Sequence, residues 1–179
     1  MINKHKQKGA ETVEFAMIAL LLFALLFAII EFSRALFVWN ALAEATRRGA
    51  RMAVVCPYQS PVSNTSPIKQ VAIFGNKASS LTNSPIIAGL KPAMVKVRYL
   101  NEAGGNETDQ TLIKFTEVSI DVSTATGYKH TLLIPLWGGS LPFSPATVAF
   151  TTTLPTESLG AVPTYPTNPP NPSPPNCVF

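Results

Sequence analysis

The stretch KQKGAETVEFAMIALLLFALLFAIIEF, residues 6–32, decides the fold of this chain. Sixteen apolar side chains follow one another without interruption from Phe15 to Ile30. The 19 residues from Thr12 to Ile30 would span about 28 Å as a helix, which is close to the hydrocarbon thickness of a bilayer, roughly 30 Å. No glycine or proline interrupts this run. The stretch therefore predicts one transmembrane helix over about residues 12–31.

The charges that flank this helix predict its orientation. Lys4, Lys6 and Lys8 precede the apolar run and favour a cytoplasmic N-terminus. Arginines beyond the helix weaken that prediction, because they balance the lysines when basic residues on the two sides are counted. A tip of nine residues before the helix nevertheless leaves everything after Glu31 to be exported. We therefore expect the N-terminus inside the cell and the rest of the chain outside the membrane.

The helix is expected to continue beyond the membrane, because residues 31–55 contain no proline and many helix formers. Residues at three- and four-residue spacing lie along one side: Phe32, Leu36, Trp39, Leu42, Thr46, Ala50 and Ala53. Another side carries Asn40, Glu44, Arg47, Arg48 and Arg51, where Glu44 can pair with Arg47 or Arg48. Cys56-Pro57 ends the pattern, because proline removes a donor and disfavours helix in the residue before it. The prediction is a helix over residues 10–56 whose second half packs against the protein's own domain.

Alternating segments farther along predict a small antiparallel sheet. The expected strands are residues 93–100, 117–123, 129–137 and 147–155, the third confined to an edge or a strand end by its proline. The loop NEAGGNETDQ joins the first two as a hairpin. Residues 68–74 are ambiguous between strand and helix. We therefore predict an α+β fold, in which the long helix packs on a small antiparallel sheet in a domain over residues 57–162.

Two cysteines, Cys56 and Cys177, form no CxxC motif or Cys/His cluster, which argues against structural zinc. In an oxidising compartment they could pair and close a loop of about 120 residues, worth up to roughly 5 kcal/mol in the chain-entropy model. The alternative is two free thiols, and the sequence leaves this choice open. Half of residues 163–176 are proline, so residues 163–179 are expected to form an extended or disordered tail.

Catalytic and nucleic-acid-binding patterns are absent from the sequence. His130 is the one histidine of the exported part and has no partner in a catalytic motif. No G-x-S-x-G, Gly-rich phosphate loop or H-E-x-x-H occurs. NETDQ, residues 106–110, approaches a calcium loop only weakly. Basic residues flank the membrane segment and are not interleaved with aromatics. We therefore expect no enzyme, no cofactor or metal, and no nucleic-acid partner.

Glu14 stands at the head of the apolar run, although an ionised carboxylate at mid-membrane depth is disfavoured by roughly 2.5–3.5 kcal/mol. A cleavable secretory signal does not explain it, because the A-x-A sites at residues 41–43 and 43–45 lie more than ten residues past Ile30. A plain signal anchor would let Glu14 extend to the cytoplasmic headgroups. In a third interpretation, a cation of a neighbouring subunit neutralises the carboxylate.

The third interpretation depends on the string from Gly9 to Phe15, which resembles a prepilin processing site cut after its glycine. Residues 9–55 as a whole resemble the TadE-like family, the pseudopilins of the Tad (Flp) pilus system. Members begin with G-x4-E-F, have an apolar helix that ends near an acidic residue, and finish with A-R-x-G-A-R-x-A, which residues 45–53 match. The ends of such proteins also resemble residues 128–135 and 151–160, so the likeness extends from residue 9 to about residue 160.

This resemblance implies a minor pilin or pseudopilin with a leader of residues 1–9, anchored in the inner membrane and exposed to the periplasm. Gly9 and Ala10 would flank the cleaved bond, and Glu14 and Phe15 would complete the processing site. The implied partners are the prepilin peptidase, the Flp pilin, sister minor pilins, the inner-membrane assembly platform and membrane lipid. The alternative is a permanently signal-anchored periplasmic binding module that does not enter a filament.

Overall fold

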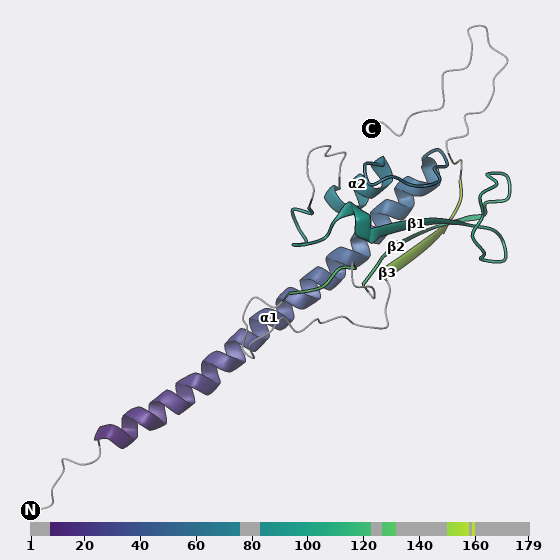
Figure 1. Cartoon of the computed structure of the whole chain (residues 1–179). Coiled ribbons are helices and arrows are strands. Elements are labelled where there is room, and N and C mark those ends of the chain that lie inside the picture. The colour runs from purple at the N-terminus through teal and green to yellow at the C-terminus, as the bar shows by residue number, and fades with distance from the viewer. Residues whose placement is uncertain (1–7, 76–82, 123–126, 132–149, 158, 160–179) are drawn as a thin grey trace, which may run out of the picture. The chain divides into compact units, whose positions relative to one another are not determined.

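The computed structural model of the 179-residue chain describes residues 8–75, 83–122, 127–131, 150–157 and 159 (Figure 1). Its elements are α1 (Lys8–Val55), α2 (Pro67–Phe74), the 3-10 helix η1 (Pro92–Met94), β1 (Val95–Leu100), β2 (Phe115–Ile120) and β3 (Phe150–Pro155). The described residues fall into two compact units. One contains α1 up to Phe37 together with Thr131, and the other contains α1 from Val38 onward with the remaining elements.

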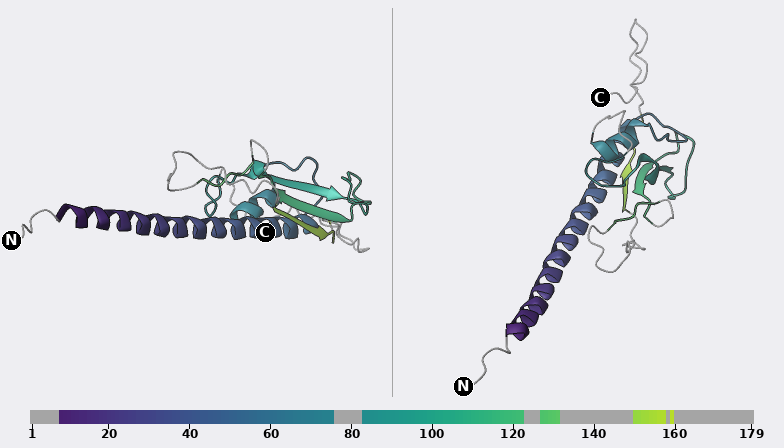
Figure 2. Two further views of the ribbon diagram at one scale, coloured as in Figure 1. Left: turned by 90° about the horizontal axis from the view of Figure 1, so that it is seen from below. Right: turned by 60° about the vertical axis from the view of Figure 1, so that its left-hand side comes forward.

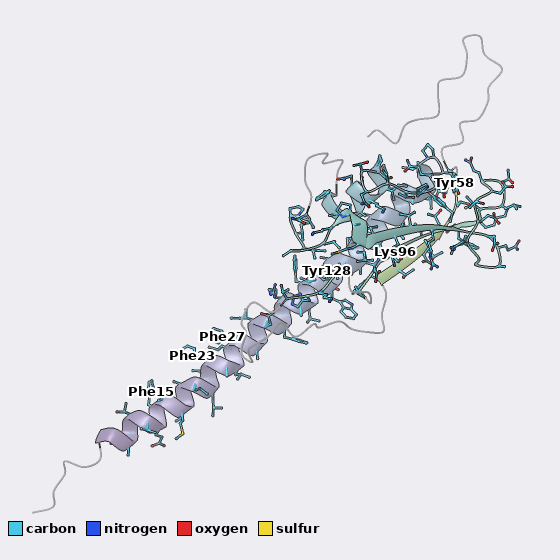
Figure 3. The ribbon with its side chains drawn as sticks, in the orientation of Figure 1. Phe15, Phe23, Phe27, Tyr58, Lys96 and Tyr128 are labelled. Carbon is cyan, nitrogen blue, oxygen red and sulfur yellow. The ribbon has the colours of Figure 1, made fainter. Side chains whose placement is uncertain are left out.

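In the first unit, which contains α1 up to Phe37, nearly all apolar side chains of the helix are exposed. Phe15 is 73% exposed and Leu21 is 68% exposed, and Figure 3 shows Phe15, Phe23 and Phe27 on this part of the helix. Apolar area left in water costs roughly 25 cal/mol per Å². Of the described helices, α1 alone is long and apolar enough to cross a membrane. The N-terminal apolar helix predicted from the sequence is therefore present and fits a single-pass membrane protein.

The second unit is built on a three-stranded antiparallel sheet in the order β1-β2-β3. Val97 pairs with Val118, and Val118 pairs with Thr152 on the other side of β2. The sheet lies along the C-terminal part of α1 (Figure 2). The α+β fold expected from the sequence is therefore confirmed, with a long N-terminal apolar helix and a small antiparallel sheet.

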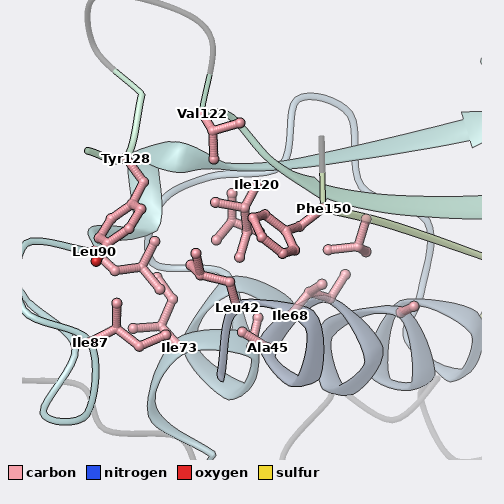
Figure 4. Packing of buried hydrophobic residues seen from close by; sticks show 14 of the residues in the cluster. Leu42, Ala45, Ile68, Ile73, Ile87, Leu90, Ile120, Val122, Tyr128 and Phe150 are labelled. Carbon is pink, nitrogen blue, oxygen red and sulfur yellow. The ribbon is translucent and has the colours of Figure 1, made fainter. Parts of the chain in front are cut away.

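The core of the second unit forms where the amphipathic half of α1 meets the sheet and α2 (Figure 4). Small residues on α1 let the other elements approach the helix closely, and Ala45, Ala50 and Ala53 are fully buried. Branched side chains from α2 and the sheet fill the opposite side: Ile68, Ile73, Val95, Val118 and Ile120. The predicted apolar side of this half is confirmed at Leu42 and Thr46, which are also buried.

Two features differ from or refine the sequence analysis. Residues 68–74, ambiguous in the sequence, lie in α2, which begins at Pro67, ends at Phe74 and is followed by Gly75 in the left-handed conformation. Proline at a first helical position and glycine after the last one are favoured helix-end signals. Of the two arginines expected as partners of Glu44, Arg47 makes that ion pair, and Arg48 donates a hydrogen bond of 3.3 Å from Nη2 to the carbonyl of Ala72 in α2.

The strand boundaries also shift by a few residues. The first strand begins at Val95 instead of residue 93, because Pro92–Met94 forms a 3-10 turn, and the second begins at Phe115, two residues earlier than expected. The expected strand at 147–155 is β3 from Phe150, and residues 147–149 lie outside the described residues. The same holds for residues 132–137 of the expected strand at 129–137, and for the tail at 163–179.

Candidate processing and assembly site

Gly9, Ala10, Glu14 and Phe15 all lie in the first two turns of α1 and are exposed. A Cβ atom placed on Gly9 would meet nothing within 4 Å among the described residues. Ala10 and Glu14 are four residues apart and therefore share one face of the helix. The structure thus places the four predicted residues together, while their roles in processing stay a prediction.

Two acidic residues bound the apolar span, and their surroundings differ. At the C-terminal end, Oε1 of Glu31 lies 2.8 Å from Nη2 of Arg34, and the Glu31 side chain is 14% exposed. The Arg34 guanidinium also donates a hydrogen bond to the carbonyl oxygen of Thr131. Glu31 is therefore neutralised within its own chain by a cation one helical turn away.

Glu14 has no such neighbour in the part of the chain that the structure describes. The ion pairs there join Glu31 to Arg34, Glu44 to Arg47, Asp121 to Lys96 and Glu117 to Arg98. The Glu14 side chain is exposed in a span that otherwise carries apolar groups. A carboxylate in such a span is stabilised by a cation or by leaving the hydrocarbon. Glu14 is in none of these ion pairs, so its carboxylate either leaves the hydrocarbon or is paired by a cation from outside the described residues.

The contrast between the two glutamates was not found from the sequence. The signal for it was the spacing of Glu31 and Arg34, which is the i, i+3 spacing of a helical ion pair. No group of three or more histidine, cysteine or acidic side chains able to hold a metal occurs among the described residues. The ion pairs along the described part of α1 are those of Glu31 with Arg34 and of Glu44 with Arg47.

Residues 9–51 match the family model of the TadE-like protein. The chain carries a TadE-like segment. The resemblance drawn from the G-x4-E-F start and the arginine-rich finish is therefore confirmed over this span. The family suggests a protein associated with a Tad pilus, structural and not catalytic in its role. The comparisons with curated proteins and with solved structures give no match.

Cys56, one of the two cysteines whose pairing the sequence leaves open, is fully buried directly after the end of α1. Its backbone N–H donates to the carbonyl of Met52, which extends the helical hydrogen bonding by one residue. The described residues contain no free cysteine. Cys177 lies outside the described residues, so the pairing of the two cysteines stays a prediction.

Proposed function

We propose that this protein is a minor pilin or pseudopilin that helps to initiate or support assembly of a Tad-type pilus. The observation that carries the proposal is the difference between Glu31, paired with Arg34, and Glu14, which has no cation among the described residues. Within the membrane, a subunit alone would bear the free-energy cost of that carboxylate. Association with another subunit that supplies a cation would remove it.

The proposed cation is the α-amine that cleavage after Gly9 creates on Ala10. Removal of residues 1–9 also removes three lysines, and the new amine lies at the very start of the apolar helix. When two such helices lie side by side with an offset, the amine of one chain can approach Glu14 of the next. Glu14 would thereby set the register of the helices, because other offsets would leave the carboxylate unpaired.

The exposed apolar side chains of α1 supply the remaining contact. Phe15, Leu21 and Leu25 are among the side chains that would pack against equivalent helices, in lipid or in a filament. The proposed partners are the prepilin peptidase, the Flp pilin, sister minor pilins and the inner-membrane assembly platform. The proposed location is the inner membrane, with a cytoplasmic N-terminus, a periplasmic second unit and incorporation into a pilus that serves surface attachment.

A permanently anchored binding module is the second candidate, and the groove between α1 and β3 described below favours it. Such a protein would keep its leader and act as a monomer tethered to the membrane. Glu14 would then extend to the cytoplasmic headgroups and have no role in assembly.

The deciding experiment is the intact mass and N-terminal sequence of the protein extracted from its native membrane. The proposal expects a mature chain that begins at Ala10. The matched control is a strain without the prepilin peptidase, in which the same protein should keep residues 1–9. An intact leader in a strain with an active peptidase would overturn the pilin assignment and favour the anchored binding module.

A further inference from the structure

A groove with a cavity volume of about 250 Å³ lies between α1 and β3 in the second unit. It is lined by Trp39, Ala43, Thr46 and Arg47 of α1 and by Phe150, Thr151 and Thr152 of β3. The rings of Trp39 and Phe150 pack edge to face with centroids 5.0 Å apart, and the Thr46 and Thr152 hydroxyls are 2.9 Å apart. These two contacts join the walls, so the groove is preformed.

One wall of the groove is a sheet edge, because β3 is the last strand in the order β1-β2-β3 of the described sheet. A strand edge presents backbone N–H and C=O groups to an extended segment of another chain. Charged residues that would blunt such an edge are absent from Phe150–Pro155, whose sequence is FTTTLP. The groove therefore suits an extended or loop segment.

The mouth of the groove is positively charged. Arg47 is 62% exposed, and its nearest carboxylate, that of Glu44, lies 3.8 Å away and is itself 49% exposed. Exposed pairs of this kind contribute little to stability, so Arg47 remains available to a better partner. Arg51 is also exposed and follows Arg47 by four residues on the same side of α1. The occupant should therefore carry carboxylates.

The same molecule presents such a segment in the loop Asn101–Gln110 between β1 and β2. Glu102, Glu107 and Asp109 give it three carboxylates and it has no basic residue. Oε1 of Glu107 accepts hydrogen bonds from the N–H groups of Thr108 and Asp109 at 2.9 and 3.1 Å. Oδ1 of Asp109 accepts from the backbone and hydroxyl of Thr111. The carboxylates of Glu107 and Asp109 are thus fixed in direction before any partner arrives.

The loop and the groove lie at opposite ends of the sheet and do not meet within one molecule. The loop follows Leu100 and precedes Phe115, whereas the groove residues of β3 begin at Phe150, which pairs with Ile120 at the far end of β2. Phe115 and Ile120 are five residue steps apart along β2, about 17 Å, and the groove residue Thr152 pairs with Val118, three steps or about 10 Å from Phe115. Complementary surfaces at separate places on one molecule join copies head to tail, which generates a ring where the rotation between copies closes and an open chain where it does not.

We propose that the groove between α1 and β3 binds the acidic loop Asn101–Gln110 of a second copy of this chain, with Arg47 facing the loop carboxylates. This inference rests on the proposed pilin function, because head-to-tail contacts between copies require an assembly in which the second units lie in series. It identifies a contact outside the membrane that would support the register set by Glu14.

The contact can be tested with the full-length protein in its native membrane and in pili purified from the same cells. Thr108, an exposed residue of the loop, is replaced by the photo-reactive residue benzoyl-phenylalanine, and the sample is irradiated. We expect an adduct of two copies whose cross-linked peptide lies between Trp39 and Arg51 or between Phe150 and Thr152. An adduct with a different protein, an adduct mapped elsewhere, or no adduct would overturn the proposal.

Charge reversal tests which side chains make the contact. Arg47→Glu alone and Asp109→Arg alone should each reduce the adduct by about tenfold or more, because like charges that face one another cost several kcal/mol. The two changes combined in one chain should restore it, since each copy then presents both reversed surfaces. Lys91→Glu is the matched control, an exposed residue of the second unit outside both surfaces, and should leave the adduct unchanged. Failure of the combined variant to restore the adduct would contradict the pairing.

Failure of this inference can be separated from failure of the proposed function. If the chain begins at Ala10 and is present in purified pili, but no self-adduct forms, the loop–groove contact is wrong and the pilin assignment stands. If the leader is retained and the protein is absent from pili, both fail together.

Discussion

Gly49 of α1 packs directly against Val118 of β2: a Cβ atom placed on the glycine would lie 3.0 Å from Cγ1 of Val118 and 3.0 Å from Cβ of Ala72. Both neighbours are fully buried and belong to different elements, β2 and α2. The helix, the sheet and α2 thus meet at one residue without a side chain. Close approach at this point allows three elements to share one small core.

Gly49→Val should destabilise the second unit by roughly 1–3 kcal/mol, because overpacking forces neighbouring side chains or backbone to shift. Thermal unfolding of the detergent-solubilised protein measures the change. Asn40→Val is the matched control, since it introduces the same side chain at an exposed position of α1 and should cost less than about 0.5 kcal/mol. Equal effects of the two substitutions would show that the core accommodates the added side chain, because valine has a higher helix propensity than glycine and propensity cannot account for a loss.

The hydroxyls of Thr46 and Thr152 connect α1 to β3 at 2.9 Å, and Thr46 also bonds the carbonyl of Ala43 at 2.8 Å. Because Thr46 donates to that carbonyl, Thr152 donates to Thr46. Each single change to valine should cost about 0.5–1.5 kcal/mol. The double change should cost less than the sum, since no hydroxyl is then left without its partner. Additive effects in a double-mutant cycle would argue against the interaction.

Much of the fold followed from periodicity in the sequence. Two patterns predict α1 and its buried side: the apolar run to Ile30, and the three- and four-residue spacing of Leu42, Thr46, Ala50 and Ala53. The spacing is sufficient because residues three and four apart lie on the same face of a helix. Residues 68–74 could not be assigned from pattern alone, since an apolar run of this length suits either a strand or a short helix.

The contacts between elements could not be predicted in this way. The sequence shows that residue 49 is glycine but not that Val118 and Ala72 face it. Arg47 and Arg48 are adjacent in the sequence, but Arg48 donates to a carbonyl of α2 whereas Arg47 lines the groove. Only tertiary packing gives the two arginines different contacts. The candidate processing site from Gly9 to Phe15 could be predicted from the sequence because its residues are contiguous. The groove was not, since its walls lie more than a hundred residues apart in sequence.

Lys69 is buried in α2, and its Nζ donates a hydrogen bond of 3.2 Å to Oδ1 of Asn64. Burial lowers the pKa of this amine from its ordinary 10.5. The folded chain therefore holds the proton less tightly than the unfolded chain. The charged amine therefore lowers the free energy of unfolding. This reduction has its full size below the folded-state pKa, where the amine is protonated in both states, and it decreases as the pH rises toward 10.5.

Lys69→Met should accordingly raise the melting temperature at neutral pH, and the gain over the parent protein should shrink as the pH rises. Unfolding scans over a pH series measure both effects. Lys91→Met, which changes an exposed lysine of the same unit, is the control and should show no such trend. A gain that stays constant with pH would assign the effect to packing of the methionine and not to the amine.

If Cys56 and Cys177 pair, their disulfide ties residue 177 to the buried end of α1. Neither thiol should react with iodoacetamide in the unfolded, unreduced chain, whereas both should react after reduction. Cys177→Ser should lower the free energy of unfolding by up to roughly 5 kcal/mol. Modification of both cysteines before reduction, measured by intact mass, would contradict the pairing.

Glu14 is the residue on which the proposed assembly depends. Glu14→Ala removes the carboxylate that drives association in the membrane, where its penalty is roughly 2.5–3.5 kcal/mol at mid-membrane depth. Since about 1.4 kcal/mol corresponds to tenfold in an equilibrium constant, filament number should fall by at least about tenfold. Counts of pili by electron microscopy measure the effect.

Glu11→Ala is the matched control, because Glu11 is an exposed acidic residue in the first turn of the same helix. It should leave pilus number close to that of the parent strain, and both variants should still begin at Ala10. A normal number of pili with Glu14→Ala, with the protein processed and present at its usual level, would remove Glu14 from the mechanism. Loss of pili with both variants would instead indicate that the net charge of the helix start matters more than the position of one carboxylate.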